Sequence, residues 1–422
     1  MAFNSVNPHC LEHIIGLSEK HEVVVQEDIH DLTGTKLLAS GYTVSRSMQE
    51  KLSRRRLARP LEASLSVAGG TSLEVIAADA LLLLEQNEIM AAIAGSSGAR
   101  ALIRSLQNLP LPGPVKLLLT SAREGTSNYP HTIATIVVCA GLAVRLGLND
   151  RDGSHLLLAA LVHDIGELYV HPDYLNGSKL LSPAEWKHVA THPVVGHAFI
   201  GEFTSYPAVI AECVLHHHER LDGSGYPFQV QGSAVNRLAA ILGVADSVSA
   251  IAIRRNIGLR ERLLVALRII PEEFDRATVA AINSALAALP PTEPSASPAN
   301  CSELIQLVLA RLDNAGQVAL ALSKGASSSS IQSARNHAIS VLANIQKSLR
   351  ATGVSDPTQI AMILDDPLIA HETLLVTNEI SWRLRSLARN IHLRVERTKN
   401  LAELNAVAGL INALDPTAPP PV

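Results

Sequence analysis

The pattern of apolar positions changes along the chain. In residues 1–65, two short apolar runs at 23–25 and 36–38 flank the turn-forming stretch 31–35 and predict a hairpin. A helix that Ser45 can cap follows them. We therefore expect a small N-terminal α/β region.

Beyond residue 65 the apolar positions recur at helical spacing. Periodic stretches at residues 73–85 and 89–106 predict a helical connector over residues 66–125, which a proline-rich stretch interrupts near residue 112. Residues 126–288 are expected to form one helical domain. Its predicted helices cover residues 131–148, 154–163, 182–191, 206–217 and 235–253. Ser182 and Glu185 have capping-box spacing at the start of the third.

A change in composition marks the end of this domain. Residues 289–300 are rich in proline and serine and are expected to form a linker. Residues 301–415 again predict helices, and the proline-rich residues 416–422 predict a disordered tail. The C-terminal helices are interpreted as a module for homodimerisation or a protein partner, with a structural extension as the alternative. The fold class is mainly α.

Composition narrows the function classes. Apolar residues make up 47% of the 422 residues but aromatic residues only 3%, so the core must be built from Ala, Leu, Ile and Val, which favours packed helices. The formal net charge is −4. A chain without a basic footprint is not expected to bind DNA or RNA broadly.

The sequence predicts a cytoplasmic protein. Its four cysteines are far apart and show no CxxC pair, which indicates reduced thiols. No apolar run approaches the roughly 20 residues of a membrane helix, and the N-terminus lacks signal-peptide features. We expect no membrane insertion.

Histidine is distributed unevenly. Ten of the 17 histidines lie between His131 and His218. The adjacent pair His163 and Asp164 ends an apolar helical stretch, where an imidazole and a carboxylate can both bind a divalent metal ion. A carboxylate can also bridge two ions. Taken alone, a His-Asp dipeptide is a weak signal.

Further polar residues in apolar surroundings strengthen this signal. His192 follows a predicted helix, and His216, His217 and His218 end another. Asp246 lies in an otherwise apolar helix, where a carboxylate is disfavoured unless it is paired or bound to metal. Incidental solvent-facing histidines and a salt-bridged Asp246 are the alternatives. The remaining histidines of this segment, His155, His171, His188 and His197, are expected to be solvent-facing or structural.

The order and spacing of these residues resemble the HD-GYP domains of bacterial cyclic di-GMP phosphodiesterases. The likeness covers residues 126–288. It is carried by His163-Asp164-Ile165-Gly166, His192-Pro193-Val194-Val195-Gly196, His217-His218-Glu219-Arg220-Leu221-Asp222-Gly223-Ser224-Gly225-Tyr226-Pro227 and Val244-Ala245-Asp246, with His131 opening the preceding helix.

The resemblance implies an HD-superfamily helical fold and two divalent metal ions. One ion would be held by His131, His163, Asp164 and Asp246, and the other by Asp164, His192, His217 and His218, with Asp164 bridging. His216 would then be a neighbour of the ligands, although a one-residue shift onto it stays open. Nitrogen and oxygen ligands suit iron or manganese and permit zinc, nickel or cobalt.

The resemblance also implies a reaction. A bridging hydroxide would attack the phosphodiester bond of cyclic di-GMP and yield pGpG, GMP or both, in bacterial signalling. The catalytic residues would be Asp164, His163 and Tyr226. The substrate would be contacted by Arg255, Asp222, Gly223, Gly225, Tyr226 and Pro227.

The chain departs from the family pattern at several positions. Glu167 stands where the family usually has a lysine that helps to hold phosphate, and this charge should repel an anionic ligand. Gly258 stands where a second basic residue is common, and Ser127 stands where some members carry a glutamate for a third metal. Two alternatives therefore stay open: a weak or inactive receptor or scaffold that binds metal, and a hydrolase of another nucleotide.

Overall fold

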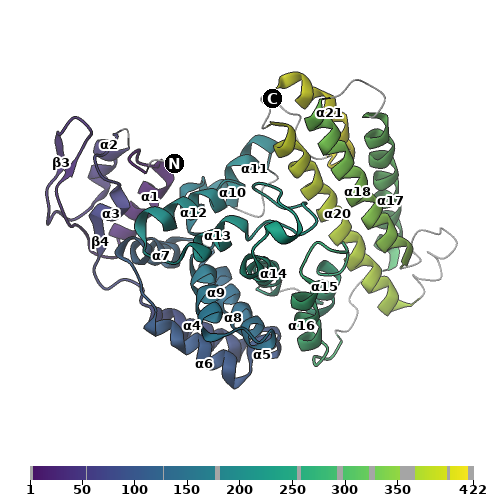
Figure 1. Ribbon diagram of the computed structural model, residues 1–422, viewed down its shortest axis with the longest axis horizontal. Helices are drawn as coiled ribbons and strands as arrows, with labels where there is room; N and C mark the ends of the chain where they lie inside the picture. The colour runs from purple at the N-terminus through teal and green to yellow at the C-terminus, as the bar shows by residue number, and fades with distance from the viewer. Residues whose placement is uncertain are drawn as a thin grey trace. The chain divides into compact units, whose positions relative to one another are not determined.

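The computed structural model describes residues 3–53, 55–126, 128–175, 181–253, 258–291, 298–322, 328–351, 366–396 and 400–416. The chain divides into two compact units that alternate along the sequence (Figure 1). The first contains residues 1–177, 188–218 and 236–253, and the second contains residues 178–187, 219–235 and 254–422. The expected domain limits stay predictions, and the tail from residue 417 lies outside the described residues.

The first unit begins with a small α/β region. Helix α1 (Pro8–Ser18) precedes two short antiparallel pairs, in which β1 (Val23–Val25) pairs with β4 (Leu65–Val67) and β2 (Ile29–His30) pairs with β3 (Lys36–Leu38). The α/β character is therefore confirmed, but the predicted pairing of residues 23–25 with 36–38 is wrong.

The turn at residues 31–35 explains the observed pairing. The Asp31 carboxylate accepts hydrogen bonds from the backbone N–H groups of Thr33 and Thr35, at 2.9 and 3.0 Å. This closes a tight turn, so only the residues directly beside it can form the hairpin. Val23–Val25 lies further back and pairs instead with Leu65–Val67.

Short helices complete this region. Ser45 occupies the N-cap of η1 (Arg46–Met48), which continues into α2 (Gln49–Leu52), but its hydroxyl bonds Ser47 and not a backbone N–H. The helix α3 (Leu61–Ser64) leads into β4.

The connector is helical as predicted, except for one break. It contains α4 (Leu73–Gln86), α5 (Glu88–Ala94), α6 (Ser97–Ser105), η2 (Leu106–Asn108) and α7 (Gly113–Gly125). The periodic stretch 89–106 is divided into α5 and α6, because Gly95 ends α5 and the Ser96 hydroxyl caps α6 by accepting from the N–H of Ala99.

Four helices of the first unit fall where the periodicity predicts them: α8 (Tyr129–Arg145), α9 (Asp150–Val162), α13 (Ala208–His216) and α14 (Arg237–Ala252). The helices η3 (Ile165–Tyr169), α10 (Pro172–Leu175) and α12 (His192–Phe203) lie in segments for which the periodicity predicts no helix. Helix α8 packs against both α9 and α14 and is almost entirely buried. Helix α12 packs against α13 and η3.

The second unit is mainly helical in its described part. It contains the start of α11 (Pro183–Val189), η4 (Gly232–Ala234), α15 (Leu259–Ala266), α16 (Arg276–Leu286), α17 (Pro298–Ala321), α18 (Ser329–Ala351), α20 (Pro367–Glu396) and α21 (Leu401–Leu414). One apolar core joins α17, α18, α20 and α21 with Ile269 and Ile270. The predicted capping box at α11 is confirmed, since Ser182 and Glu185 exchange hydrogen bonds.

The mainly α fold class is confirmed. Among the described residues, no helix combines the length and apolar character that a membrane crossing requires.

Close packing at Gly166 fixes η3 against α12. A side chain at Gly166 would collide with the backbone carbonyl of His192, whereas a side chain at Gly201, later in α12, would meet nothing. Replacing Gly166 with alanine should therefore lower the melting temperature by the equivalent of about 1–3 kcal/mol, as overpacked sites do.

The matched control is Gly201→Ala, which should raise stability by about 1 kcal/mol, because alanine is the better helix former. Thermal unfolding followed by circular dichroism measures both variants. An unchanged melting temperature for Gly166→Ala would show that this contact does not constrain the fold.

Candidate metal centre

Four side chains of the first unit form one half of a buried polar cluster. His131 lies in the first turn of α8, His163 follows the end of α9, Asp164 precedes η3, and Asp246 lies within α14. The Nε2 atom of His131 lies 2.9 Å from Asp246 Oδ1, and His163 Nε2 lies 3.0 Å from Asp164 Oδ2. The two Nε2 atoms are 3.3 Å apart. Helices distant in sequence thus bring two imidazoles and two carboxylates together.

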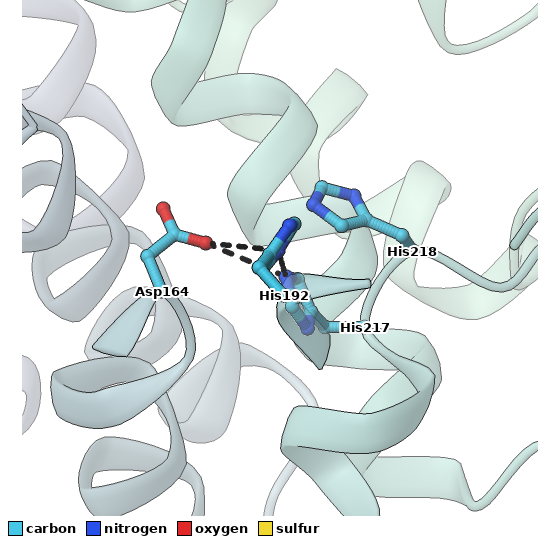
Figure 2. Close-up of side chains that lie close together, drawn as sticks. All are labelled: Asp164, His192, His217 and His218. Atoms are coloured by element: carbon cyan, nitrogen blue, oxygen red, sulfur yellow. Dashed lines mark hydrogen bonds and ion pairs between the residues drawn. The ribbon is translucent and has the colours of Figure 1, made fainter. Parts of the chain in front are cut away.

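The other half contains Asp164, His192, His217 and His218 (Figure 2). The Nε2 atoms of His192 and His217 each lie 3.5 Å from Asp164 Oδ1, while the other oxygen of Asp164 faces His163. His218 Nδ1 lies 3.5 Å from Asp246 Oδ2. Asp164 therefore stands between the halves with one oxygen directed to each, and all seven residues of the predicted ligand set lie in one cluster.

Three of the imidazoles are oriented by the same local interaction. Each Nδ1 atom donates a hydrogen bond to the backbone carbonyl three residues earlier, within the last turn of a helix: His163 to Ala160 at 2.8 Å, His192 to Val189 at 2.8 Å and His217 to Val214 at 2.6 Å. Carbonyls in the last turn of a helix have no intrahelical partner. A carbonyl can only accept, so the proton of a neutral ring lies on Nδ1 and Nε2 carries a lone pair.

With the proton on Nδ1, the Nε2 atom of each neutral ring is available to bind a cation. The Nε2 atoms of His192 and His217 are 3.3 Å apart. Two such lone pairs repel one another unless a proton or a metal ion lies between them. Metal-bound histidines commonly donate their second ring nitrogen to a carbonyl or carboxylate, as these do. The donor set therefore fits a divalent metal.

Burial and charge pull the histidine pKa values in opposite directions. Burial lowers the pKa of His192 to about 4, which Asp164 opposes only in part. Burial also disfavours charge on His163, but the carboxylates of Asp164 and Asp246 outweigh it and raise the pKa of His163 to about 9. The histidines in turn hold the pKa of Asp164 and of Asp246 well below the usual range, although burial opposes them. Both carboxylates are thus anionic donors.

A cavity of about 410 Å³ adjoins this cluster within the first unit. Its wall includes Asp164, Glu167 and Asn128 on one side and His13 of α1 on another. The Asn128 side chain donates a hydrogen bond to Glu167 Oε2. Burial, followed by the charges of Asp164 and Asp246, raises the pKa of Glu167 well above its ordinary value. Glu167, which stands where the family usually has a lysine, therefore lines a cavity beside the candidate ligands.

Sequence reasoning missed Asn128 and His13. Asn128 stands three residues before His131, where its place at the start of the ligand helix was the only available signal. His13 gave none, because nothing in the sequence indicates that α1 packs near η3.

The other residues that the sequence predicts for the site belong to the second unit or fall outside the described residues. Asp222, Gly223, Gly225, Tyr226 and Pro227 follow His218 directly in the chain but belong to the second compact unit. Gly258 precedes α15 with a φ of 75°. Arg255 and Ser127 fall outside the described residues.

The histidines that are not predicted to bind metal lie outside the cluster. His155, His171, His188, His197 and His216 are half-buried or exposed and belong to neither group of candidate ligands. The ligand geometry therefore selects His217 and His218 over His216. The thiols of Cys10, Cys139 and Cys213 are free and buried, and the Cys301 side chain is not among those described.

Comparison with known proteins identifies the domain that carries this cluster. Residues 116–276 match the HD domain family. The chain is 36% identical over 138 residues to a cyclic di-GMP phosphodiesterase of Pseudomonas aeruginosa, covering 31% of this chain and 33% of that protein. It is 31% identical over 139 residues to 3'3'-cGAMP-specific phosphodiesterase 1 of Vibrio cholerae, covering 32% of each chain.

Other relatives agree with this assignment. The cyclic di-GMP phosphodiesterase response regulator RpfG of Xanthomonas campestris is 33% identical over 129 residues, covering 30% of this chain and 33% of that protein. The chain thus spans about a third of the length of the curated relatives it matches. The match to the HD domain family covers residues 116–276, and the resemblance to the HD-GYP family is confirmed over this part of the chain.

A solved structure, Bd1817, a HDG"Y"P protein from Bdellovibrio bacteriovorus, covers 64% of this chain and 98% of its own. With 12% identity and a TM-score of 0.35, that similarity is too low to carry an argument.

The histidine triple offers a matched test of the cluster. His217→Ala removes one of the facing Nε2 donors and should reduce bound metal by about one ion per chain. His216→Ala changes the neighbouring residue outside the cluster and should leave metal content unchanged. Elemental analysis of anaerobically purified variants decides, and equal metal loss in both would refute the ligand assignment.

Metal affinity should fall as pH decreases. In the metal-free protein the raised pKa of His163, about 9, means that its ring is protonated below that pH. A metal that binds His163 Nε2 must displace this proton, so affinity should drop about tenfold for each pH unit below 9. Titration calorimetry with Mn²⁺ in two buffers of different ionisation enthalpy should show proton release at pH 7, and identical heats in both buffers would contradict it.

Proposed function

We propose that this protein hydrolyses a phosphodiester bond of a cyclic dinucleotide, with cyclic di-GMP as the preferred substrate, at a site for two divalent metal ions. The observation that carries the proposal is the set of histidine Nε2 atoms around Asp164, which lie 3.0 Å (His163) and 3.5 Å (His192 and His217) from its carboxylate oxygens. The names of the relatives, which are cyclic di-GMP and cGAMP phosphodiesterases, support the substrate class.

The two halves of the cluster define the proposed ligand sets. His131, His163, Asp164 and Asp246 would hold one ion, and Asp164, His192, His217 and His218 the other. Bound divalent ions supply a water of lowered pKa and neutralise phosphate charge. Nitrogen and oxygen donors without thiolate favour iron or manganese, with zinc, nickel or cobalt as further candidates.

The chain's own residues would then orient the substrate. Asp164 lines the cavity, whose volume of about 410 Å³ falls within the range of small-ligand pockets, and His163 contacts the Asp164 carboxylate. Tyr226, with Asp222, Gly223, Gly225 and Pro227, would shape the substrate pocket, and Arg255 would contact a phosphate. Hydrolysis with the ribose 3′ oxygen as leaving group gives pGpG, and a second hydrolysis gives GMP.

Glu167 favours a second candidate function. Its carboxyl group replaces the lysine of the family and lines the same cavity as Asp164. An anionic or hydrogen-bonded glutamate cannot hold phosphate as a lysine does. The second candidate is therefore a metal-bound receptor that retains a cyclic dinucleotide with little or no turnover. A hydrolase of a related dinucleotide, such as 3'3'-cGAMP, is a further outcome of the same test.

Turnover assays on one metal-loaded sample separate these functions. Cyclic di-GMP, 3'3'-cGAMP and pGpG are incubated with the protein, and products are resolved by chromatography. Conversion of cyclic di-GMP to pGpG or GMP supports the proposal. Binding without conversion identifies the receptor, and preferential cGAMP conversion reassigns the substrate.

The value of kcat/KM should rise as the charge at position 167 becomes more positive. Glu167→Lys should raise kcat/KM by about tenfold, because a cation replaces a group that disfavours the anionic substrate. Glu167→Gln, which removes only the carboxylate, should have a smaller effect of about threefold. Lower turnover in Glu167→Lys with metal content unchanged would show that Glu167 itself contributes to the reaction.

A further inference from the structure

One face of helix α20 contacts the loop that follows the metal-binding histidines. The loop comprises residues 219–231 and is called here the glycine loop. Arg383, Leu387, Asn390 and Arg394 recur at spacings of four, three and four residues, which places them on one face of the helix. Both α20 and the glycine loop belong to the second compact unit.

Asn390 is the central contact. Its side-chain amide donates to the backbone carbonyl of Ser224, and its own backbone carbonyl accepts from Gln229 Nε2 at 3.1 Å. One turn later, Arg394 Nη2 lies 3.4 Å from the carbonyl of Gly223. Helix α20 thus bonds two consecutive carbonyls at the tip of the glycine loop.

The environment of Asn390 indicates that the contact has a specific role. The residue is 3% exposed in the interior of a 30-residue helix, although asparagine is a poor helix former and its buried amide needs partners. An apolar residue would suit the neighbouring core of Leu387 and Ile391 better. The glycine loop supplies the hydrogen bonds that make asparagine tolerable there.

A second attachment lies further back along the same face. Arg383 donates to Glu273 Oε1 at 2.5 Å and to the carbonyl of Ala266 at 3.0 Å. Arg220, in the glycine loop, lies 3.6 Å from the same Glu273 oxygen. The backbone carbonyl of Glu273 accepts from the N–H of Leu221. The buried carboxylate of Glu273 therefore joins the start of the loop to α20.

An aromatic contact adds a third link. Tyr226 packs edge-on against Trp186, with ring centroids 5.5 Å apart, and the Arg389 guanidinium lies 4.5 Å from the centroid of Trp186. Arg389 precedes Asn390 in α20. The tyrosine proposed to shape the substrate pocket is thus connected to the same helix.

The loop does not fix all of its own groups. The Glu219 carboxylate accepts from the N–H groups of Phe228 and Gln229, and Asp222 accepts from Ser224, which together close the loop internally. The carbonyls of Gly223 and Ser224, by contrast, are bonded by α20. The tip of the loop therefore depends on a helix more than 150 residues away in sequence.

We infer that Asn390 of α20 is a positioning residue, which fixes the glycine loop in its substrate-binding conformation and makes the C-terminal helical region part of the active enzyme. This inference rests on the proposed function for its catalytic consequence. Because α20 shares its core with α17, α18 and α21, a partner or second copy that shifts these helices would act on the glycine loop through this contact.

The test compares Asn390→Ala with Asn336→Ala in the full-length chain. Asn336 is an exposed asparagine of α18 whose side-chain oxygen accepts a hydrogen bond from the adjacent Arg335. Hydrogen exchange followed by mass spectrometry should show about tenfold faster exchange across residues 219–231 in Asn390→Ala, as loss of a buried hydrogen bond predicts. Exchange in α8, α9 and α14 should not change, and Asn336→Ala should match the unmodified protein.

Steady-state kinetics distinguish a positioning role of Asn390 from a general loss of folded protein. Asn390→Ala should raise KM for cyclic di-GMP about tenfold and keep its metal content, whereas a merely structural loss would lower the active fraction and leave KM unchanged. If Asn390→Ala does not fold, Arg394→Ala, which removes the weaker contact to Gly223, replaces it in both assays. Unchanged loop exchange in a folded variant overturns the inference.

The two arms also distinguish this inference from the proposed function. Loop exchange needs no turnover, so it decides the contact even when cyclic di-GMP is not hydrolysed. Absence of turnover in the unmodified, metal-loaded protein would refute the proposed function. Faster loop exchange with unchanged KM would restrict α20 to a structural role and overturn the positioning claim.

Discussion

The candidate site depends on one repeated interaction, the hydrogen bond from a histidine Nδ1 to an unpaired carbonyl in the last turn of a helix. It occurs at His163, His192 and His217 and turns three Nε2 atoms towards Asp164. Each bond satisfies a helix terminus and fixes a tautomer at the same time, so the backbone does most of the orientation. The close approach of Gly166 to His192 sets the distance between two of these helix ends. The packing of these helix ends therefore also determines where the candidate metal ligands lie.

Much of this could be predicted from the sequence, because the signals are local. Four helices of the first unit follow from apolar periodicity, and the seven candidate ligands follow from the resemblance to the HD-GYP motifs. The misses have physical reasons. The pairing of Val23–Val25 with Leu65–Val67 is a long-range choice that no short pattern encodes. The break between α5 and α6 depends on a serine cap inside a periodic stretch. The contacts of Asn128 with Glu167, and of Asn390 with Ser224, join distant segments through single polar groups.

Glu167, which departs from the family pattern, is not one of the candidate ligands but lines the adjoining cavity. Asp164 and its histidines keep the donor atoms and tautomers that a divalent ion requires, whereas Glu167 changes the charge of the adjoining cavity. Retained ligands beside an altered cavity are consistent with modified substrate handling. The attachment of the glycine loop to α20 offers a second point, within the second unit, at which the same reaction could be adjusted.

The central claim is that Asp164 lies between two metal ions held by the two halves of the cluster. Electron paramagnetic resonance of protein loaded with two equivalents of Mn²⁺ tests it most directly. Two Mn²⁺ ions that are bridged by a carboxylate and lie roughly 3.5–4 Å apart are exchange-coupled. We therefore predict a coupled spectrum and loss of the six-line signal of isolated Mn²⁺. Asp164→Asn should restore that isolated signal. An uncoupled six-line spectrum at full loading of the unmodified protein would contradict the account.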